Sequence, residues 1–167
     1  MRIAGMKHDS IVDGPGLRFV VFMQGCEHKC PGCWNPTTHD PGGGVDFPME
    51  ELVEQMLSNP LTDGLSLSGG EPFGQAAACA ALAREARKAG LNVWCWTGYL
   101  FETLRDHGTD AQKELLGEID VLVDGPFVQA EKTLDLPWKG SRNQRIIRVQ
   151  ESLRQNAVVL WEDGTQI

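Results

Sequence analysis

The stretch of residues 17–35, LRFVVFMQGCEHKCPGCWN, joins an apolar, β-rich run directly to a loop that carries three cysteines. Cys26, Cys30 and Cys33 follow a Cys-x3-Cys-x2-Cys spacing. Such crowding is poor geometry for a disulfide framework, whereas thiolates that converge on one loop are ligands for soft metal centres. We therefore expect a metal site at the carboxyl end of the first predicted strand.

Similar apolar runs recur along the chain, and most of them precede a helical pattern. Strands are predicted at residues 17–23, 65–67, 91–96 and 119–123. Helices are predicted from Pro48 to a stop at Asn59-Pro60, over 75–89 with Gly90 after the C-cap, and over 99–107 and 111–118. The glycine-rich residues 40–45 are expected to form a mobile loop, since no Gly-Lys-Ser/Thr follows to complete a phosphate-binding motif.

Strands joined by helices predict an α/β fold with a mainly parallel sheet, whose ligands lie at the carboxyl ends of the strands. A closed eight-stranded barrel takes about 250 residues, and this chain has 167. We therefore expect an incomplete, or partial, βα barrel whose inner face is open on one side. No internal repeat or boundary is evident, so residues 1–167 are predicted to form a single domain.

The composition argues against several classes of function. The formal net charge is −8 and the pI about 4.9, so a broad basic face for nucleic acid is not expected. No apolar run approaches the roughly 20 residues of a membrane span, and residues 1–10 lack a signal-peptide core. We expect a cytoplasmic protein with no nucleic-acid or membrane partner. The remaining cysteines, Cys79 and Cys95, are expected in the hydrophobic core.

The three clustered cysteines are compatible with two kinds of metal centre. A [4Fe-4S] cluster is ordinarily closed by four cysteines, so three local ligands would leave one iron open to a small molecule. The alternative is a Cys3His zinc site that uses His28 or His39. Structural zinc usually draws on two separated ligand pairs, and no second Cys-x-x-Cys occurs in the chain. The iron-sulfur interpretation is therefore favoured.

A second motif, SLSGGEP at residues 66–72, ends the next predicted strand. It is compatible with an ordinary turn, because glycine tolerates positive φ and proline ends a strand ladder. It is equally compatible with a binding edge, where glycines let a ligand approach the backbone and Glu71 offers a carboxylate to an ammonium group. An open-iron cluster beside such an edge is far more specific than either motif alone.

Together, the cysteine loop and the Gly-Gly-Glu-Pro edge resemble those of radical S-adenosylmethionine enzymes, whose open iron binds the amino and carboxylate groups of S-adenosylmethionine. The segment VDGPGLR at 12–18 resembles the entry segment of glycyl-radical-enzyme activases. Three further segments resemble the activases of anaerobic ribonucleotide reductase: WTGY at 96–99, VDGPF at 123–127 and WKGSRNQ at 138–144. The resemblance covers nearly the whole chain.

This resemblance implies an oxidoreductase with a partial barrel of the radical S-adenosylmethionine type and a [4Fe-4S] cluster on Cys26, Cys30 and Cys33. In such enzymes S-adenosylmethionine is cleaved to methionine and a 5′-deoxyadenosyl radical. The radical then takes a hydrogen atom from a glycine, here on a loop of anaerobic ribonucleoside-triphosphate reductase. An external low-potential donor such as flavodoxin would supply the electron. The alternatives are an activase of the pyruvate formate-lyase type, a non-catalytic iron-sulfur electron carrier and a zinc module.

The resemblance also assigns cofactor contacts, and each has a structural alternative. The implied contacts to S-adenosylmethionine are Gly32, Cys33, Trp34, Gly69, Gly70, Glu71 and Thr97. Gly32 stands where the wider superfamily has an aromatic residue, so backbone groups of residues 32–34 are the expected adenine contacts. The structural alternatives are half-exposed packing for Trp34 and a helix cap for Thr97.

Other polar residues also have two interpretations. Asp13 either lies near the substrate loop or forms an ordinary turn. Asp124 is either a pocket carboxylate or a turn residue. The basic residues Lys139, Arg142, Arg145 and Arg148 either dock an acidic partner surface or form a solvated face.

Overall fold

In the computed structural model, which describes residues 1–162, seven strands form one sheet in the order β3-β1-β2-β4-β5-β6-β7. The strands are β1 (Arg2–Ser10), β2 (Arg18–Met23), β3 (Val45–Asp46), β4 (Gly64–Gly69), β5 (Asn92–Trp96), β6 (Val121–Asp124) and β7 (Arg145–Arg148). The central strands β2, β4, β5 and β6 are parallel. The outer strands β1, β3 and β7 pair antiparallel, so the sheet is mixed rather than mainly parallel.

The helices of the described residues alternate with the central strands. They are α1 (Met49–Leu57), α2 (Ala76–Lys88), α3 (Phe101–His107), α4 (Asp110–Glu118) and α5 (Val149–Gln155), with short 3-10 turns η1 (Pro36–Thr38), η2 (Pro72–Gln75) and η3 (Gln129–Glu131). A capping box of Thr109 and Gln112 begins α4, and Gly90, with φ of +81°, follows α2. None of these helices is long and apolar enough to cross a membrane.

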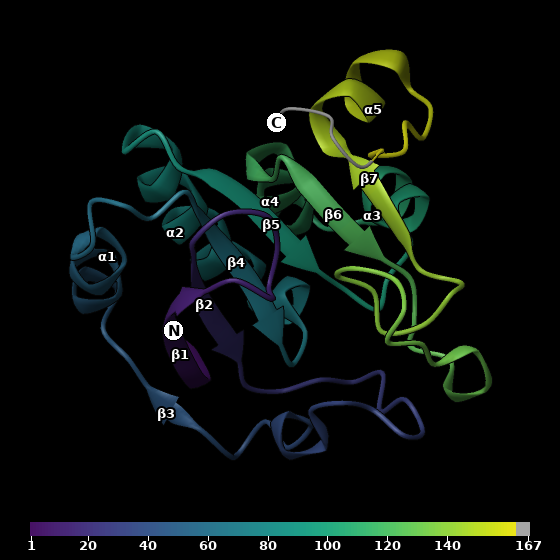
Figure 1. The fold of residues 1–167 in the computed structure, drawn as a ribbon, viewed down its shortest axis with the longest axis horizontal. Coiled ribbons are helices and arrows are strands. Elements are labelled where there is room, and N and C mark those ends of the chain that lie inside the picture. Colours follow the sequence, from purple (N-terminus) through teal and green to yellow (C-terminus); the bar gives the residue numbers. More distant parts are fainter. Residues whose placement is uncertain (163–167) are drawn as a thin grey trace.

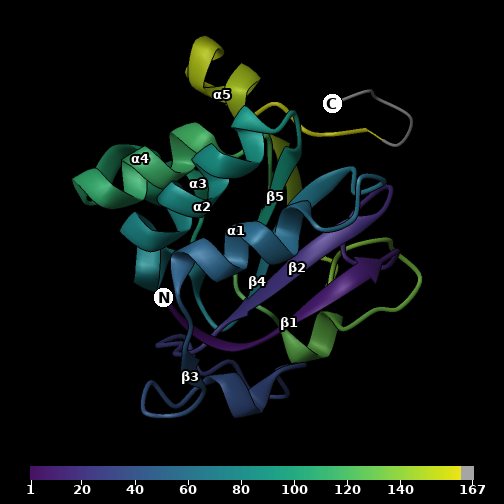
Figure 2. The ribbon, with the colours of Figure 1, turned by 90° about the vertical axis from the view of Figure 1, so that its left-hand side faces the viewer.

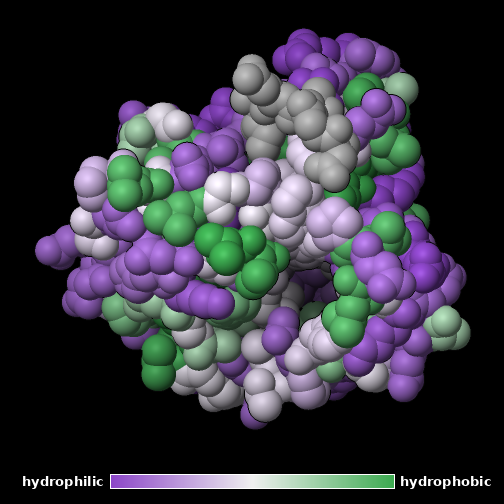
Figure 3. All heavy atoms as spheres, in the orientation of Figure 1, coloured by the Kyte–Doolittle hydropathy of each residue, from purple (hydrophilic) through white to green (hydrophobic). Residues whose placement is uncertain are grey.

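Side chains alternate between the two faces of the sheet, as the pleat requires. One face packs against α2, α3 and α4, which Figure 2 shows gathered on the same side of the strands. The main core lies there and includes Phe19, Val21, Met23 and Leu67. The opposite face carries a smaller aromatic cluster around the fully buried Trp94. This second face is toward the viewer in Figure 3, where apolar patches alternate with polar ones and the surface is hollowed near the middle.

All four predicted strands are present, and three further strands were not predicted. β1 and β7 contain several charged residues, and β3 has only two residues, so none shows a sustained apolar pattern. The prediction of a loop over residues 40–45 was wrong at its end, because Val45 pairs with Ile3. The helix predicted from residue 99 begins at Phe101. The two buried cysteines Cys79 and Cys95 lie in the core as expected.

The parallel strands bring the sequence motifs to one edge. The carboxyl ends of β2, β4, β5 and β6 point toward the lower side of Figure 1, where the loop that follows β2 passes beneath them. The cysteine loop follows β2, the Gly-Gly-Glu-Pro motif ends β4, and Thr97 directly follows β5. The partial barrel itself stays a prediction, whereas this shared edge is a feature of the structure.

Candidate metal centre

The cysteine loop is closed at its base by hydrogen bonds between its two ends. The Gly25 amide donates to the Thr38 carbonyl at 2.8 Å, and the Cys26 amide donates to the His39 carbonyl at 3.2 Å. The buried side chain of Gln24 donates to the Asp40 carbonyl at 2.6 Å. The loop is therefore anchored before its first cysteine and again after its last, which limits how far the three thiols can spread.

Inside the loop, a tight turn joins the second and third cysteines. The Cys33 amide donates to the Cys30 carbonyl at 3.2 Å, and Gly32 has a φ of +71° that favours glycine. The Asn35 amide donates to Cys33 Sγ at 3.4 Å. All three loop cysteines are unpaired and half-buried, and burial raises the pKa of Cys26.

This donor set fits a [4Fe-4S] cluster with three protein ligands. Three unpaired thiols on one closed loop supply soft ligands, and an amide directed at Cys33 Sγ is the kind of hydrogen bond that tunes cluster sulfurs. Residues 1–162 contain no group of three His, Cys, Asp or Glu side chains placed to hold a single metal ion. In a cubane the cysteines bind different irons, so that arrangement is not what a cluster requires.

The two histidines considered as zinc ligands have different surroundings. Nε2 of His28 lies 2.7 Å from Oε2 of Glu71, and this hydrogen bond raises the pKa of His28. Nε2 of His39 is buried without a hydrogen-bond partner. His28 is therefore already engaged in a hydrogen bond within the protein, and this hydrogen bond links the cysteine loop to the second motif.

The Glu71 carboxylate is buried, and both of its oxygens accept hydrogen bonds. Its side chain is 2% exposed. Besides His28, its donors are the amides of Phe73 and Gly98, each at 3.0 Å, and the Thr97 hydroxyl at 2.9 Å. The sequence suggested that this carboxylate meets an ammonium group, whereas in the structure protein donors surround it.

Two glycines allow the second motif to approach the cysteine loop closely. A Cβ on Gly69, where φ is +91°, would lie 2.7 Å from the Met23 amide nitrogen, and one on Gly70 would lie 3.0 Å from the Met23 carbonyl oxygen. The Gly70 amide donates to that carbonyl and the Glu71 amide to the Gly25 carbonyl, both at 2.8 Å. Any larger side chain would separate the two motifs.

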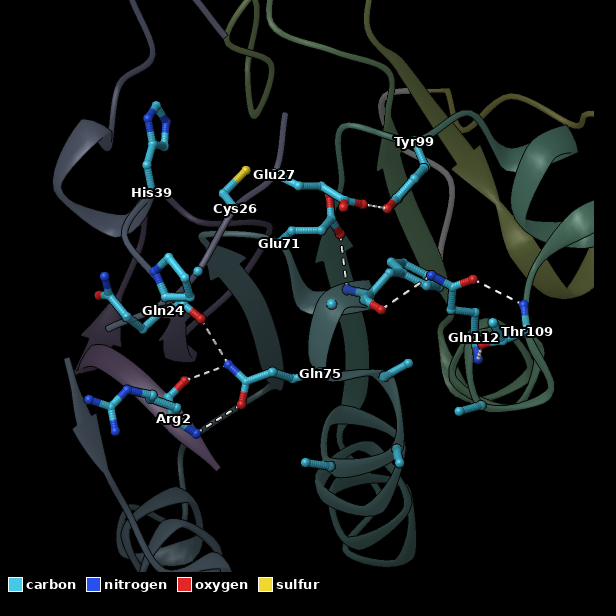
Figure 4. Close-up of a pocket in the computed structure, with 18 of the residues that line it drawn as sticks. Arg2, Gln24, Cys26, Glu27, His39, Glu71, Gln75, Tyr99, Thr109 and Gln112 are labelled. Carbon is cyan, nitrogen blue, oxygen red and sulfur yellow. Dashed lines mark hydrogen bonds between the residues drawn. The ribbon is translucent and has the colours of Figure 1, made fainter. Parts of the chain in front are cut away.

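A cavity of about 1050 Å³ opens beside the cysteine loop. Cys26, Glu27 and Tyr99 line it together with the first turns of α2 and α4. Figure 4 shows Cys26 and Glu27 on its upper side, with the Tyr99 hydroxyl hydrogen bonded to the Glu27 carboxylate. Ligand pockets typically measure about 300–1,000 Å³, so this cavity is large enough for a small-molecule cofactor.

The remaining predicted contacts are distributed around this edge. Trp34 is half-exposed and packs edge-on against Phe127, with Lys132 Nζ 3.7 Å from its ring centroid. Thr97 does not cap α3, because that helix begins at Phe101; its hydroxyl instead accepts from the Tyr99 amide at 3.1 Å.

Asp13 is not among the residues that line the cavity. Its carboxylate accepts from the Ser10 hydroxyl at 2.5 Å, and its carbonyl accepts from the Ser66 hydroxyl at 2.6 Å. The loop around Asp13 is therefore tied to the middle of β4, at the first residue of the second motif.

Asp124 and the three late arginines have structural partners. Asp124 is fully buried; it accepts from the Phe101 amide at 2.8 Å and pairs with Arg145. Arg145 also pairs with Glu102 at 2.7 Å. The other two arginines pair with acidic neighbours: Arg142 with Asp135, and Arg148 with Glu151. The arginines therefore do not form a free basic patch, and Asp124 is not a pocket carboxylate.

Comparison with known proteins agrees with this donor set. Residues 12–147 match the family described as a 4Fe-4S single cluster domain. A protein of Vibrio cholerae is 39% identical over 148 residues, which cover 83% of this chain and 92% of the relative. One of Escherichia coli K12 is 39% identical over 80% of this chain and 90% of the relative, and one of phage T4 is 37% identical over 81% and 86%. All three are named anaerobic ribonucleoside-triphosphate reductase-activating protein. The chain, with its 4Fe-4S single cluster domain, thus belongs to the family of anaerobic ribonucleoside-triphosphate reductase-activating proteins.

Proposed function

We propose that this chain is a radical S-adenosylmethionine oxidoreductase that generates the glycyl radical of anaerobic ribonucleoside-triphosphate reductase. The observation that carries the proposal is the closed loop of three unpaired cysteines, joined by backbone hydrogen bonds to the Gly-Gly-Glu-Pro edge. Relatives of nearly the same extent are named as activators of this reductase. Their similarity favours the reductase over other glycyl radical enzymes as the partner.

Cys26, Cys30 and Cys33 would hold the cluster, and no fourth cysteine lies in the loop. When bound, a [4Fe-4S] cluster supplies one low-potential electron for cleavage of the sulfonium into methionine and a 5′-deoxyadenosyl radical. That electron comes from an external donor, such as a flavodoxin, in a reducing cytoplasm. Addition of one electron to the sulfonium gives methionine, which is closed-shell, and one carbon-centred radical, so atoms and electrons balance.

The chain itself contributes binding and positioning. Backbone groups of Gly32, Cys33 and Trp34 are the proposed adenine contacts, and the main chain at Gly69 and Gly70 is close enough to the cysteine loop to contact the same ligand. Burial of Glu71 and Thr97 beneath this edge keeps water from the floor of the site. Radical formation requires no side-chain acid, base or nucleophile.

The partner's glycine must reach the radical as part of a peptide. We place its approach at the face of the sheet opposite the helices, where the Asp13 loop lies against β4. On this proposal the sheet acts as a partial barrel whose open side admits the peptide. Asp13 is then a contact for the loop rather than a catalytic group.

The test is the appearance of a glycyl radical under anaerobic, reducing conditions. Reconstituted protein, S-adenosylmethionine and a reductant are mixed either with the reductase or with pyruvate formate-lyase, and electron paramagnetic resonance detects the radical. A radical on the reductase alone supports the proposal. A radical only on pyruvate formate-lyase would reassign the partner. A cluster that reduces but never cleaves S-adenosylmethionine would instead indicate an electron carrier, and tightly bound zinc would indicate an interaction module.

A further inference from the structure

One contact joins the interior of the cysteine loop to the end of β4. His28 lies between the first two cysteines, and its Nε2 is 2.7 Å from Glu71 Oε2. The imidazole is 18% exposed and the carboxylate 2% exposed, so the hydrogen bond is largely removed from water. Because it is charge-assisted and shielded, this contact is stronger than an ordinary surface hydrogen bond.

The ring of His28 is also held from the turn after β5. Its centroid lies 4.6 Å from that of Tyr99, with the two planes at 73°. The other neighbour is Gly98: a Cβ there would lie 2.7 Å from Nε2 and 2.8 Å from Cγ of the imidazole. Only glycine leaves room for the ring, so two chain segments outside the cysteine loop, the end of β4 and the turn after β5, fix its position.

The carboxylate of Glu71 has little capacity left for a ligand. An ionised carboxylate offers about four lone-pair positions. Here two backbone amides, the Thr97 hydroxyl and His28 already donate to it. An ammonium group could bind only by displacing one of these donors, which would leave that donor buried without a partner.

We propose that Glu71 and His28 form a clamp that fixes the cysteine loop, and that Glu71 is a positioning residue rather than a ligand of the S-adenosylmethionine ammonium group. The proposal rests on the proposed function in one respect, namely that the loop holds the cluster. Glu71 orients His28, and His28 holds the segment between Cys26 and Cys30. Outer contacts of this kind typically change metal affinity about 10–100-fold when they are removed.

The experiment is a double-mutant cycle on the anaerobically reconstituted protein. The variants are Glu71→Gln, His28→Gln and the double variant, with His107→Gln as a control because His107 is exposed on α3. Two quantities are measured for each: the rate of iron release to a chelator, and the dissociation constant of S-adenosylmethionine from its effect on the spectrum of the reduced cluster. Neither depends on the reductase.

The clamp requires that each single variant release iron about 10-fold faster than wild type. The double variant should be little faster than either single one, because the pair acts as a unit. S-adenosylmethionine should bind all retained clusters with a dissociation constant within about 3-fold of wild type. His107→Gln should match wild type in both measurements.

Two results would overturn the clamp. The first is a Glu71→Gln variant that keeps its iron but binds S-adenosylmethionine at least 10-fold more weakly. The second is a His28→Gln variant whose iron release is unchanged; this variant keeps Glu71 and its amide bonds, so misfolding is not an explanation. A wild-type protein that takes up no cluster would refute the proposed function together with the clamp, and would be seen before any variant is compared.

Discussion

Gly98→Ala is expected to break the hydrogen bond between His28 and Glu71, and so to loosen the cysteine loop, without changing any cysteine. The new Cβ would approach Cδ2 of His28 most closely and would lie 2.7 Å from Nε2, whereas ordinary contact begins at 3.4 Å, so the ring must retreat by at least about 0.7 Å. The Gly98 amide itself donates to Glu71, which keeps the carboxylate in place. Retreat of the ring therefore stretches the 2.7 Å hydrogen bond beyond the useful range of about 3.2 Å.

The loss in free energy of unfolding can be estimated from the hydrogen bond between His28 and Glu71 that is broken. A hydrogen bond to a charged group contributes about 1.5–3 kcal/mol. Alanine in place of glycine returns about 0.4–1 kcal/mol through the unfolded chain. The metal-free protein should therefore lose about 1–2 kcal/mol, which lowers the melting temperature by about 2–8 °C for a chain of this size.

Thermal unfolding of the metal-free protein measures this loss, and iron release from the reconstituted protein measures its effect on the cluster. Gly117→Ala is the matched control, because a Cβ at Gly117 in α4 would have no neighbour within 4 Å. That variant should be as stable as wild type or more so. If Gly98→Ala had the same melting temperature as Gly117→Ala and released iron no faster than wild type, the packing argument for His28 would be wrong.

Two further predictions concern the Asp124 network. Asp124→Asn should lower the free energy of unfolding in urea by about 2–3 kcal/mol, since it breaks a buried pair with Arg145. The control is Asp135→Asn, which breaks an exposed pair and should lower the free energy of unfolding by less than about 0.5 kcal/mol. Equal losses in the two variants would refute the argument. The hydrogen bond to Arg145 lowers the pKa of Glu102 below 4.5, so its stabilisation is present above pH 4.5 and lost as the pH falls through the folded value. Compared with Glu102→Gln, wild type should have a small advantage above pH 4.5, at most about 1 kcal/mol because the pair is partly exposed, and should lose it progressively as the pH falls below 4.5. An advantage that did not change with pH would contradict this argument.

The central strands and the cysteine loop could be predicted because their signals are local. Residues 19–23 are a continuous apolar run, and the placement of the alternate members Phe19, Val21 and Met23 in the main core follows from the pleat. The edge strand β7 could not be predicted, because its four residues RIIR resemble part of a charged surface segment. Its place depends on antiparallel pairing with β6, which sets Arg145 opposite Asp124.

At the site, too, local motifs could be predicted from the sequence, whereas contacts between distant segments could not. The sequence identifies Glu71 and His28 within recognisable motifs, but these residues are 43 positions apart. Their contact depends on the parallel register of β2 and β4, where Met23 lies opposite Gly69. Neither segment alone contains that register, so the sequence suggested a free carboxylate where the structure has a saturated one.

The most direct measurement is S-adenosylmethionine cleavage by single cysteine variants after anaerobic reconstitution. Cys33→Ala should lose its cluster iron and produce no 5′-deoxyadenosine under a strong reductant. Cys95→Ala, at a buried position where the pKa of the thiol is raised and no ligand role is expected, should retain both properties. Undiminished 5′-deoxyadenosine formation by Cys33→Ala would show that the three-cysteine loop is not the redox centre.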